Sequence, residues 1–379
     1  MVEVALYNAE GGFFATGGGA GRSGRDFLTS PEVGPLFGIL IARAIDRWWD
    51  DLGRPDPFVV IEAGAGRGTL ARSVLQASPR CAKALRYVLV ERSAVLRDEQ
   101  RSILPVEPLE DVLGPVRTGA SDEADENPQR VTGIGPLLTS IEALPTVDCV
   151  GVVLANELLD NLPFDVVEHT SSGWAEVRVG ISGVTPAEFC EILVPAADDL
   201  VAEVEQFAPG APIGSRVPVQ RGIGPWLSEA SASLSDGFVA VIDYAAPAEE
   251  LIARGAEGWL RTYRGHLRAA SPLVSIGEQD ITADVVLESL RRAAREAGLV
   301  SVWDGSQASW IEELGLEELL AEGRKVWQER AAIGDLEALA ARSRIGEAGA
   351  LRAEPGLGAH HVEVFAVGRT ARASQKSGR

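Results

Sequence analysis

The sequence is short of cysteine and histidine. Its 379 residues include three cysteines and four histidines, and the cysteines at 81, 149 and 190 lie too far apart to form a Cys-x-x-Cys pair. Zinc sites need such ligands at close, regular spacing, so we expect no metal centre. No apolar run approaches the roughly eighteen residues of a membrane-spanning helix. We therefore expect no membrane partner.

Basic residues are also scarce relative to acidic ones. There are 35 lysines and arginines against 55 aspartates and glutamates, a formal net charge of −20. Binding to nucleic acid needs clustered basic side chains, so we expect no nucleic-acid partner. The basic start of a signal peptide is also missing, because Glu3 and Glu10 precede the first arginine, Arg22. These absences predict a cytoplasmic protein.

Apolar residues, in contrast, make up 46% of the chain, enough for a large core. Short continuous apolar runs predict buried parallel strands, and they lie at 58–61, 87–90, 150–154, 238–242 and 362–367. The first two runs enclose a glycine-rich turn and a helical pattern, which together make a βαβ unit. We therefore predict an α/β fold with a Rossmann-like sheet and helices on both faces.

The glycine-rich turn is Glu62-Ala63-Gly64-Ala65-Gly66-Arg67-Gly68, directly after the first predicted strand. A phosphate-binding loop of the Walker type would need a Gly-Lys-Ser/Thr sequence, and the turn contains no lysine. A dinucleotide fingerprint starting at Gly64 fails because Thr69 stands at its last position. Starting from Gly66, the looser Gly-x-Gly-x-x-Ala form is met. An NAD site stays open at this point.

Two carboxylates favour S-adenosylmethionine as the ligand of this turn. Glu62 ends the first predicted strand, and an acid followed by alternate glycines suits a ligand with a cationic amino-acid end and no pyrophosphate. Glycines also let the backbone approach a ligand closely. Glu91 ends the second predicted strand, where it can accept hydrogen bonds from ribose hydroxyls; NAD enzymes use the same device. We predict S-adenosylmethionine as the cofactor.

Several further segments, in the same order, carry a family resemblance. The sequence resembles the MidA family, also called the mitochondrial complex I assembly factor 7 family, of S-adenosylmethionine-dependent methyltransferases. The resemblance implies a class I methyltransferase fold and a protein substrate. The matching stretches are DFLTSPE (26–32) with LFG (36–38), IEAGAGRGTL (61–70), ANELLDNLP (155–163), VIDYA (241–245), TYRGH (262–266) and GEQDITADV (277–285).

The resemblance also implies which residues bind the cofactor. They lie in the glycine turn, at the end of the second strand and in a helix start that Pro31 marks. We expect this set to be Glu62, Gly64, Gly66, Arg67, Gly68, Glu91, Thr29, Pro31 and Glu32.

The predicted domain organisation has one sheet core interrupted by insertions. Alternating apolar residues after Pro163 indicate an inserted antiparallel hairpin, and the polar, basic end of the chain indicates disorder. The expected parts are an N-terminal loop and helix covering the cofactor site (1–57), the first part of the core (58–163), a hairpin and helical subdomain (164–236), the second part of the core (237–368) with a substrate-side loop (246–283), and a disordered tail (369–379).

Candidate catalytic residues follow the strand at 150–154. Asn156, Glu157 and Asp160 stand where a parallel strand ends, the edge at which α/β sheets collect ligands. Carboxylates there could orient a guanidinium and help remove its proton, although Asn156 could instead cap a helix. If the segment is helical, Glu157 and Asp160 share a face. Tyr263 and His266 are substrate-side candidates.

We therefore predict a methyltransferase that acts on a protein side chain, with arginine N-methylation favoured. A small-molecule O- or N-methyltransferase stays open, as does a non-catalytic assembly factor that retains the fold. The predicted partner is a protein substrate, and the prediction leaves room for a homodimer.

Overall fold

The computed structural model describes residues 1–18, 29–114, 132–183, 188–264, 267–268 and 271–377. The chain divides into two compact units. The inserted unit comprises Met1–Phe27, Glu157–Ser228 and Asp243–Gly298, and the sheet unit comprises Leu28–Asn156, Glu229–Ile242 and Leu299–Arg379. This division differs from the expected ranges, because 164–228 and 246–283 belong to one unit although they are separate in sequence, while 229–236 belongs to the sheet unit.

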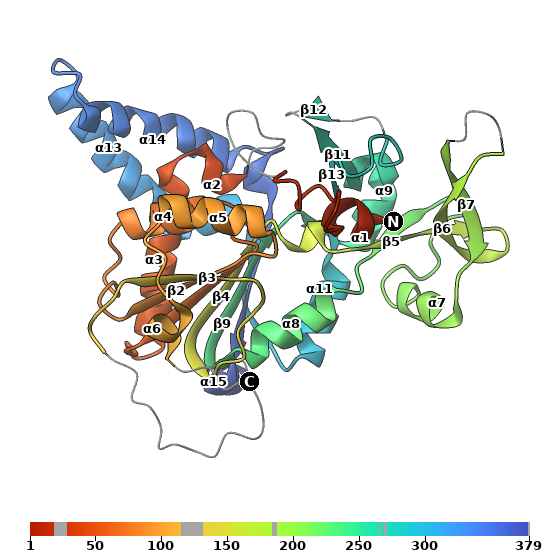
Figure 1. The fold of residues 1–379 in the computed structure, drawn as a ribbon, viewed down its shortest axis with the longest axis horizontal. Coiled ribbons are helices and arrows are strands. Elements are labelled where there is room, and N and C mark those ends of the chain that lie inside the picture. Colours follow the sequence, from red (N-terminus) through yellow and green to blue (C-terminus); the bar gives the residue numbers. More distant parts are fainter. Residues whose placement is uncertain (19–28, 115–131, 184–187, 265–266, 269–270, 378–379) are drawn as a thin grey trace. The chain divides into compact units, whose positions relative to one another are not determined.

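Among the described residues, the sheet unit is built on seven strands in the order β15-β16-β9-β4-β1-β2-β3. Figure 1 labels four of them, β9, β4, β2 and β3. Strands β1 to β4 and β9 pair in parallel, and β15 pairs with β16 antiparallel. The predicted α/β sheet is thereby confirmed, with β3 and β15 added at its edges. The strands are β1 Phe58–Ala63, β2 Leu85–Val90, β3 Leu137–Ile141, β4 Cys149–Asn156, β9 Leu234–Asp243, β15 Val300–Ser306 and β16 His361–Val367.

In the strand order, β1 lies between β2, the next strand along the chain, and the later strand β4. From β1 the chain continues outward through β2 and β3, and then returns to place β4 on the other side of β1. The chain therefore leaves β1 and β4 in opposite directions, and in α/β sheets the carboxyl ends of two such strands are where ligands usually bind. The segments that follow β1 and β4 are the glycine turn and the stretch starting at Asn156, both of which the sequence singled out.

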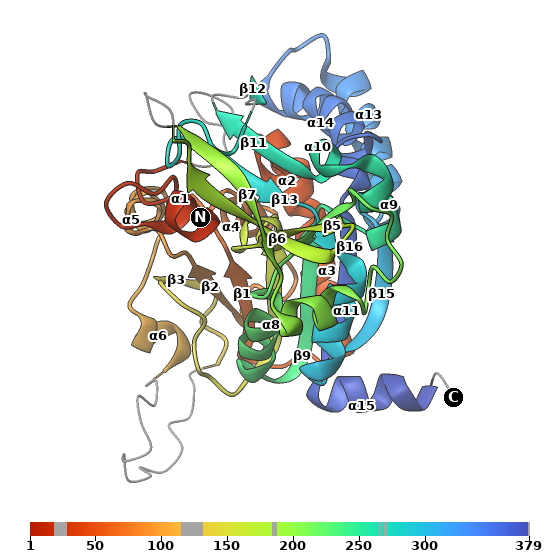
Figure 2. The ribbon, with the colours of Figure 1, turned by 90° about the vertical axis from the view of Figure 1, so that its right-hand side faces the viewer.

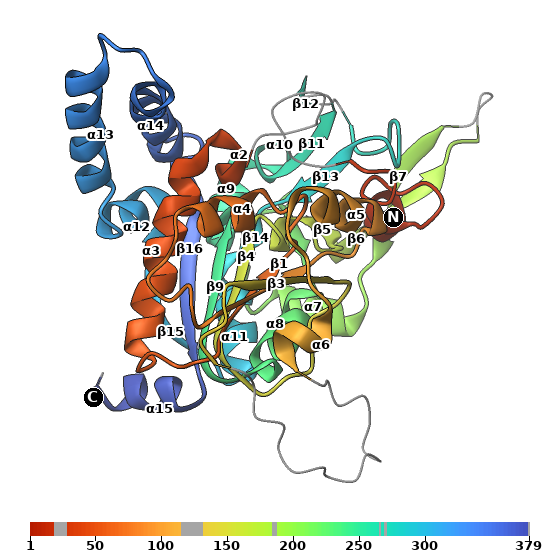
Figure 3. The same ribbon diagram turned by 60° about the vertical axis from the view of Figure 1, so that its left-hand side comes forward.

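Helices of the sheet unit include a long one, α3, that buries one apolar face. The helix whose start Pro31 marks ends at Val33, and α3 begins separately at Pro35, because Pro35 disfavours helical backbone at the preceding Gly34. Figure 3 shows α13 and α14 lying side by side. The helices are α2 Ser30–Val33, α3 Pro35–Asp51, α4 Thr69–Gln76, α5 Ala94–Ile103, α6 Leu109–Leu113, α12 Gln307–Glu313, α13 Leu316–Arg330, α14 Leu336–Arg352, the 3-10 turn η2 Leu357–Ala359, and α15 Gly368–Ser377.

Helix α15 corrects the prediction of a disordered tail. The carboxylate of Asp236 accepts hydrogen bonds from the backbone N–H of Thr370, at 2.8 Å, and from Nε of Arg369, at 3.1 Å. Ala371 is buried. A partner more than 130 residues away in the chain thus anchors the start of the helix, and local composition could not reveal it.

The inserted unit contains three small sheets, with strand orders β7-β6-β5-β8, β12-β11-β13 and β10-β14. The predicted hairpin is confirmed by the antiparallel pair β5 and β6, which Figure 2 shows. The strands are β5 Asp165–Thr170, β6 Gly173–Ile181, β7 Phe189–Pro195, β8 Arg216–Val219, β10 Ala245–Ala246, β11 Leu260–Arg264, β12 Leu267–Arg268, β13 Asp280–Ala283 and β14 Val285–Val286.

This unit has its own apolar core. Trp259 is fully buried in it, and Phe164, Trp174 and Phe207 are further buried members of the same core. Its helices are α1 Val2–Tyr7, the 3-10 turn η1 Leu159–Asn161, α7 Asp198–Val204, α8 Ile223–Ala232, α9 Ala248–Arg254, α10 Ala256–Trp259 and α11 Leu287–Glu296. Among the described residues, neither unit has a helix with the length and hydropathy to cross a membrane.

Candidate active site

The glycine turn has a backbone that only glycine adopts at low cost. Gly64, Gly66 and Gly68 have φ angles of 69°, 54° and 80°, in the left-handed region that side chains disfavour. A Cβ on Gly68 would lie 2.6 Å from Cδ1 of Leu104, so this glycine is needed for packing. A Cβ on Gly66 would meet no atom within 4 Å. The backbone at Gly66 therefore borders open space, as a ligand cradle requires.

Glu62, near the end of β1, is a buried acid in contact with Tyr87 of β2. Its side chain is buried, and the hydroxyl of Tyr87 donates a hydrogen bond to Glu62 Oε2 at 2.7 Å. Burial raises the pKa of Glu62 to about 8, against the lowering effect of the Tyr87 bond. A buried carboxyl of this kind gains from a cationic partner.

Glu91 ties the end of β2 to the glycine turn. Its Oε2 accepts the N–H of Gly66 at 2.9 Å, and its Oε1 accepts the N–H of Ser93 at 2.8 Å. Burial raises the pKa of Glu91, although these N–H groups oppose the rise. Gln100 completes the arrangement, because its Nε2 donates to the carbonyl of Gly66 at 2.6 Å while its Oε1 accepts from Ser140 at 2.6 Å.

The remaining cofactor candidates surround the same turn or the helix after it. The hydroxyl of Thr69, the first residue of α4, donates to Glu32 Oε1 at 2.6 Å and so links α2 to α4. Pro31 stands in the first turn of α2, and Thr29 is the buried residue before that helix. Arg67 forms an ion pair with Glu99 of α5, with 2.6 Å between Arg67 Nε and Glu99 Oε2.

Glu157 follows the last residue of β4 in a strained conformation. Its φ angle is 53°, a left-handed conformation that costs a residue with a side chain roughly 1–2 kcal/mol. Such conformations cluster at functional sites. Glu157 and Asn156 are both half-buried. The segment forms the short turn η1, whose N-cap is Leu158 rather than Asn156, so the helix over Glu157 and Asp160 considered above does not form.

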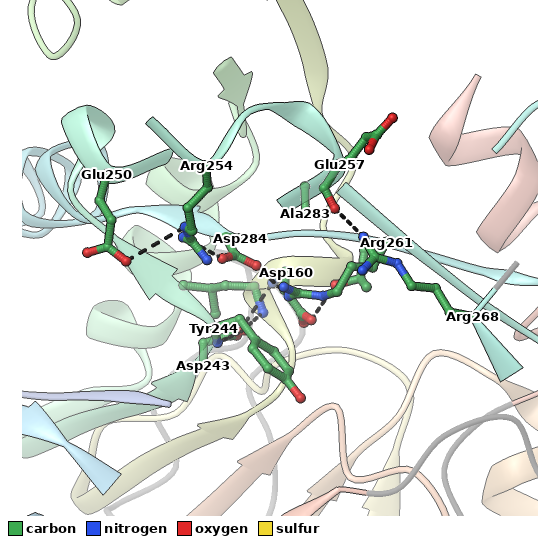
Figure 4. A network of polar contacts seen from close by, with 12 residues as sticks. Asp160, Asp243, Tyr244, Glu250, Arg254, Glu257, Arg261, Arg268, Ala283 and Asp284 are labelled. Atoms are coloured by element: carbon green, nitrogen blue, oxygen red, sulfur yellow. Dashed lines mark hydrogen bonds and ion pairs between the residues drawn. The ribbon is translucent and has the colours of Figure 1, made fainter. Parts of the chain in front are cut away.

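A network of acids and arginines lies in the inserted unit around Asp160 (Figure 4). Asp160 is buried and accepts a hydrogen bond from the hydroxyl of Thr282. The guanidinium carbon of Arg261 lies 4.3 Å from the centroid of the Tyr244 ring, a cation–π contact, and Arg261 also forms an ion pair with Asp284.

Acids outnumber bases in this network. Arg254 is a second partner of Asp284, with 2.9 Å between Nη2 and Oδ2. Glu157 and Asp243 add two further acids. Burial raises the pKa of Asp243 well above its ordinary value, and repulsion from Asp160 and, less strongly, from Glu157 adds to the rise. Acids also outnumber bases among the described residues that Figure 4 labels, an arrangement that favours the binding of a further cation. The bases are Arg254, Arg261 and Arg268, and the acids are Asp160, Asp243, Glu250, Glu257 and Asp284. Within the described residues, no group of histidine, cysteine and acid side chains is arranged to hold a metal ion.

The structure describes one of the two substrate-side candidates, Tyr263. Tyr263, in β11, is half-buried and pairs with Asp280 of β13. Burial of the guanidinium lowers the pKa of Arg261, but the electrostatic effects of Asp284 and then of Tyr263 outweigh it, so that this pKa is raised. His266 lies outside the described residues.

Sequence reasoning overlooked four residues that hold the glycine turn and the network around Asp160 in place. They are Tyr87, Gln100, Asp243 and Arg261. Asp243 had a detectable signal, because it ends the predicted strand at 238–242 just as Glu62 and Glu91 end theirs. Tyr87 and Gln100 had none, since a tyrosine within an apolar strand and a glutamine on a helix are ordinary residues. Their partners are 25 and 34 residues away in the chain.

A family model with the description "Putative S-adenosyl-L-methionine-dependent methyltransferase" matches residues 40–304, well over half of the sequence. The chain belongs to this family. Its cofactor is S-adenosylmethionine, and its reaction is methyl transfer. The open space at Gly66, the buried acid Glu62 and the carboxylate of Glu91 fit this cofactor, so the NAD alternative is set aside.

Solved and curated relatives agree with the family. A protein from Burkholderia thailandensis, solved with bound S-adenosyl-homocysteine, is similar with a TM-score of 0.77 and 27% sequence identity, over 96% of this chain and 86% of that one. Protein arginine methyltransferase NDUFAF7, mitochondrial, is 25% identical in Mus musculus over 84% of this chain and 70% of the relative. In Homo sapiens it is 27% identical over 84% and 69%.

These relatives correct one prediction. The scarcity of basic residues near the N-terminus led us to expect a cytoplasmic protein. The curated relatives are named as mitochondrial proteins, so the cytoplasmic assignment does not stand. The error arose because the absence of one kind of targeting segment was taken as support for a location.

We expect the affinity of this methyltransferase for S-adenosylmethionine to rise with pH up to about 8. We expect Glu62 to pair with the ammonium group of the cofactor. Burial raises the pKa of Glu62 to about 8, so at lower pH the carboxyl is protonated and this expected pairing is lost. Each pH unit below that value should weaken binding by up to about tenfold. Calorimetric titrations between about pH 6 and 8 measure this. Glu62→Gln should remove the dependence, and equal wild-type affinities across the range would contradict the role of Glu62.

Proposed function

We propose that the protein methylates an arginine side chain of a protein substrate, with Glu157 orienting the guanidinium. The observation that carries the proposal is the strained, half-buried Glu157, which directly follows β4 and belongs to a network with an excess of carboxyl groups. The names of the curated relatives, protein arginine methyltransferases, support the same acceptor.

The cofactor-binding role falls to the residues around the glycine turn. In this proposal Glu62 binds the cationic amino-acid end, Glu91 the ribose hydroxyls, and Gly64, Gly66 and Gly68 keep the backbone free of side chains. Arg67, Thr29, Pro31 and Glu32 support these groups from the neighbouring segments. When bound, S-adenosylmethionine supplies an activated methyl group on a sulfonium.

The acceptor needs a carboxylate for two reasons. A guanidinium is protonated, with a pKa above about 12, and its five N–H groups allow many orientations. Charge-assisted hydrogen bonds to Glu157 would select one orientation and leave one nitrogen free to react. The same carboxylate can accept the proton that a methylated nitrogen releases. Asn156 and Tyr263 are further candidates for contacts with the acceptor.

The decisive experiment identifies the methylated residue. The purified full-length protein is incubated with isotopically labelled S-adenosylmethionine and a cell extract, and mass spectrometry of digested proteins locates the label. We expect labelled arginine in a protein, and on the order of a hundredfold less label with Glu157→Gln. Label in a small metabolite would favour a small-molecule methyltransferase. Cofactor binding with no label anywhere would favour a non-catalytic assembly factor.

A further inference from the structure

Asp243, the last residue of β9, is 1% exposed and accepts four backbone N–H groups. Its Oδ2 accepts from Leu158 at 3.1 Å, from Leu159 at 2.7 Å and from Asp160 at 3.4 Å. Its Oδ1 accepts from Tyr244 at 2.9 Å. Three of these donors are the three residues that directly follow Glu157. Backbone donors on both oxygens favour a carboxylate over a carboxylic acid.

The side chain of Asp160 also shares a hydrogen bond with that of Asp243, and Figure 4 labels both residues within one network of polar contacts. Asp160 Oδ2 accepts from the hydroxyl of Thr282. Asp160 Oδ1 is buried and has no hydrogen-bond partner among the described residues. Two ionised carboxylates cannot donate to each other, so their contact requires a proton. Since donors already occupy both oxygens of Asp243, the proton belongs on Oδ1 of Asp160.

The charged groups around the pair are consistent with one shared proton. Burial raises the pKa of both carboxyls. Repulsion from Asp160 raises the pKa of Asp243 further, whereas the hydrogen bond between the two side chains lowers the pKa of Asp160. Asp284 raises the pKa of Asp160 and Arg261 lowers it. Glu157 raises the pKa of Asp243. A pair of adjacent buried carboxyls that titrate together retains one proton over a wide pH range.

We propose that Asp243 is a positioning residue for Glu157: as a carboxylate bound by the protonated Asp160, it fixes the backbone of residues 158–160 and thereby the left-handed conformation of Glu157. Neither aspartate touches the substrate in this arrangement. The proposal rests on the proposed function of Glu157, but its structural part can be tested without any methyl acceptor.

The test compares Asp243→Asn with Asp160→Asn. An asparagine at 160 can donate to Asp243 and accept from Thr282, so it reproduces the protonated acid. An asparagine at 243 must turn an NH2 group toward N–H donors on one side, which breaks their hydrogen bonds. We expect kcat to fall at least about tenfold further in Asp243→Asn than in Asp160→Asn, with cofactor affinity unchanged in both. The reverse order would overturn the proposal.

Two measurements are independent of turnover. The infrared difference spectrum between the wild type and Asp160→Asn at neutral pH should contain the carbonyl band of a buried protonated carboxyl. Glu62, whose raised pKa also leaves it protonated, contributes equally to both proteins and cancels. The difference between the wild type and the exposed control Asp199→Asn should lack the band. Hydrogen exchange at the amides of Leu158, Leu159 and Asp160 should be slow in the wild type and fast in Asp243→Asn. A difference spectrum between the wild type and Asp160→Asn without the band would overturn the proposal even if Asp243→Asn fails to fold. If no arginine methylation is detected, the infrared and hydrogen-exchange results still test whether Asp243 and the protonated Asp160 hold the backbone of residues 158–160.

Discussion

Gly66→Val is expected to abolish the binding of S-adenosylmethionine while the protein stays folded. The backbone at Gly66 borders open space, and a Cβ there meets no protein atom within 4 Å, so the valine side chain would enter the volume that the cofactor needs. We expect the affinity to fall at least about a hundredfold, the scale on which a clash at a closely packed ligand outweighs a binding contact. Calorimetry measures the affinity and circular dichroism the fold.

The left-handed backbone at Gly66 requires a matched control. A valine at a φ angle of 54° adds strain of roughly 1–2 kcal/mol whether or not a ligand is bound. Gly53, after α3, has a φ angle of 79° and is equally free of neighbours, so Gly53→Val adds similar strain without approaching the proposed cofactor site. The control should lower the melting temperature comparably and leave the affinity intact. Normal cofactor binding by Gly66→Val would show that the ligand lies elsewhere.

Glu157→Gln is expected to lower turnover on the order of a hundredfold or more, the scale of a lost positioning or proton-accepting group. Glutamine keeps the size of the side chain but removes the charge that holds a guanidinium and accepts its proton. Cofactor affinity should change little, because in the proposal Glu62 and Glu91 bind that ligand. Steady-state kinetics with the identified substrate and calorimetry with the cofactor measure the two quantities.

Glu249→Gln provides the matched control, because it removes an equal charge from an exposed position on α9 of the same unit. Its turnover and melting temperature should match the wild type. If Glu157 served only the local fold, the melting temperature of Glu157→Gln would fall and turnover would survive. That result would remove Glu157 from the mechanism and leave the methyltransferase family assignment in place.

The parts of the site that sequence could reveal are those encoded locally. Continuous apolar runs identified five strands of the central sheet, because a parallel strand buried on both faces needs apolar residues throughout. The glycine turn was identifiable because left-handed backbone next to a ligand restricts the residue type. Glu157 stood out from its place after a buried strand, although its φ angle and the absence of a helix there were visible only in the structure.

Other features depended on contacts between distant segments. The hydrogen bonds of Asp243 join the end of β9 to a turn 83 to 85 residues earlier, and those of Asp236 anchor α15 from β9. The two edge strands β3 and β15 were not predicted. β15 carries several exposed residues and only a weak apolar pattern, so its place in the sheet depends on pairing with β16.

By itself, the sequence determined the fold class, the glycine turn with Glu62 and Glu91, and the family, because each depends on residue types within a short stretch of chain. Tertiary structure alone decided which groups hold these residues in place. Tyr87 and Gln100 secure the cofactor turn, and Asp243 secures the turn after Glu157. The physical reason is that a hydrogen bond between segments depends on the distance and direction of two groups in space, and the chain specifies these only once it has folded.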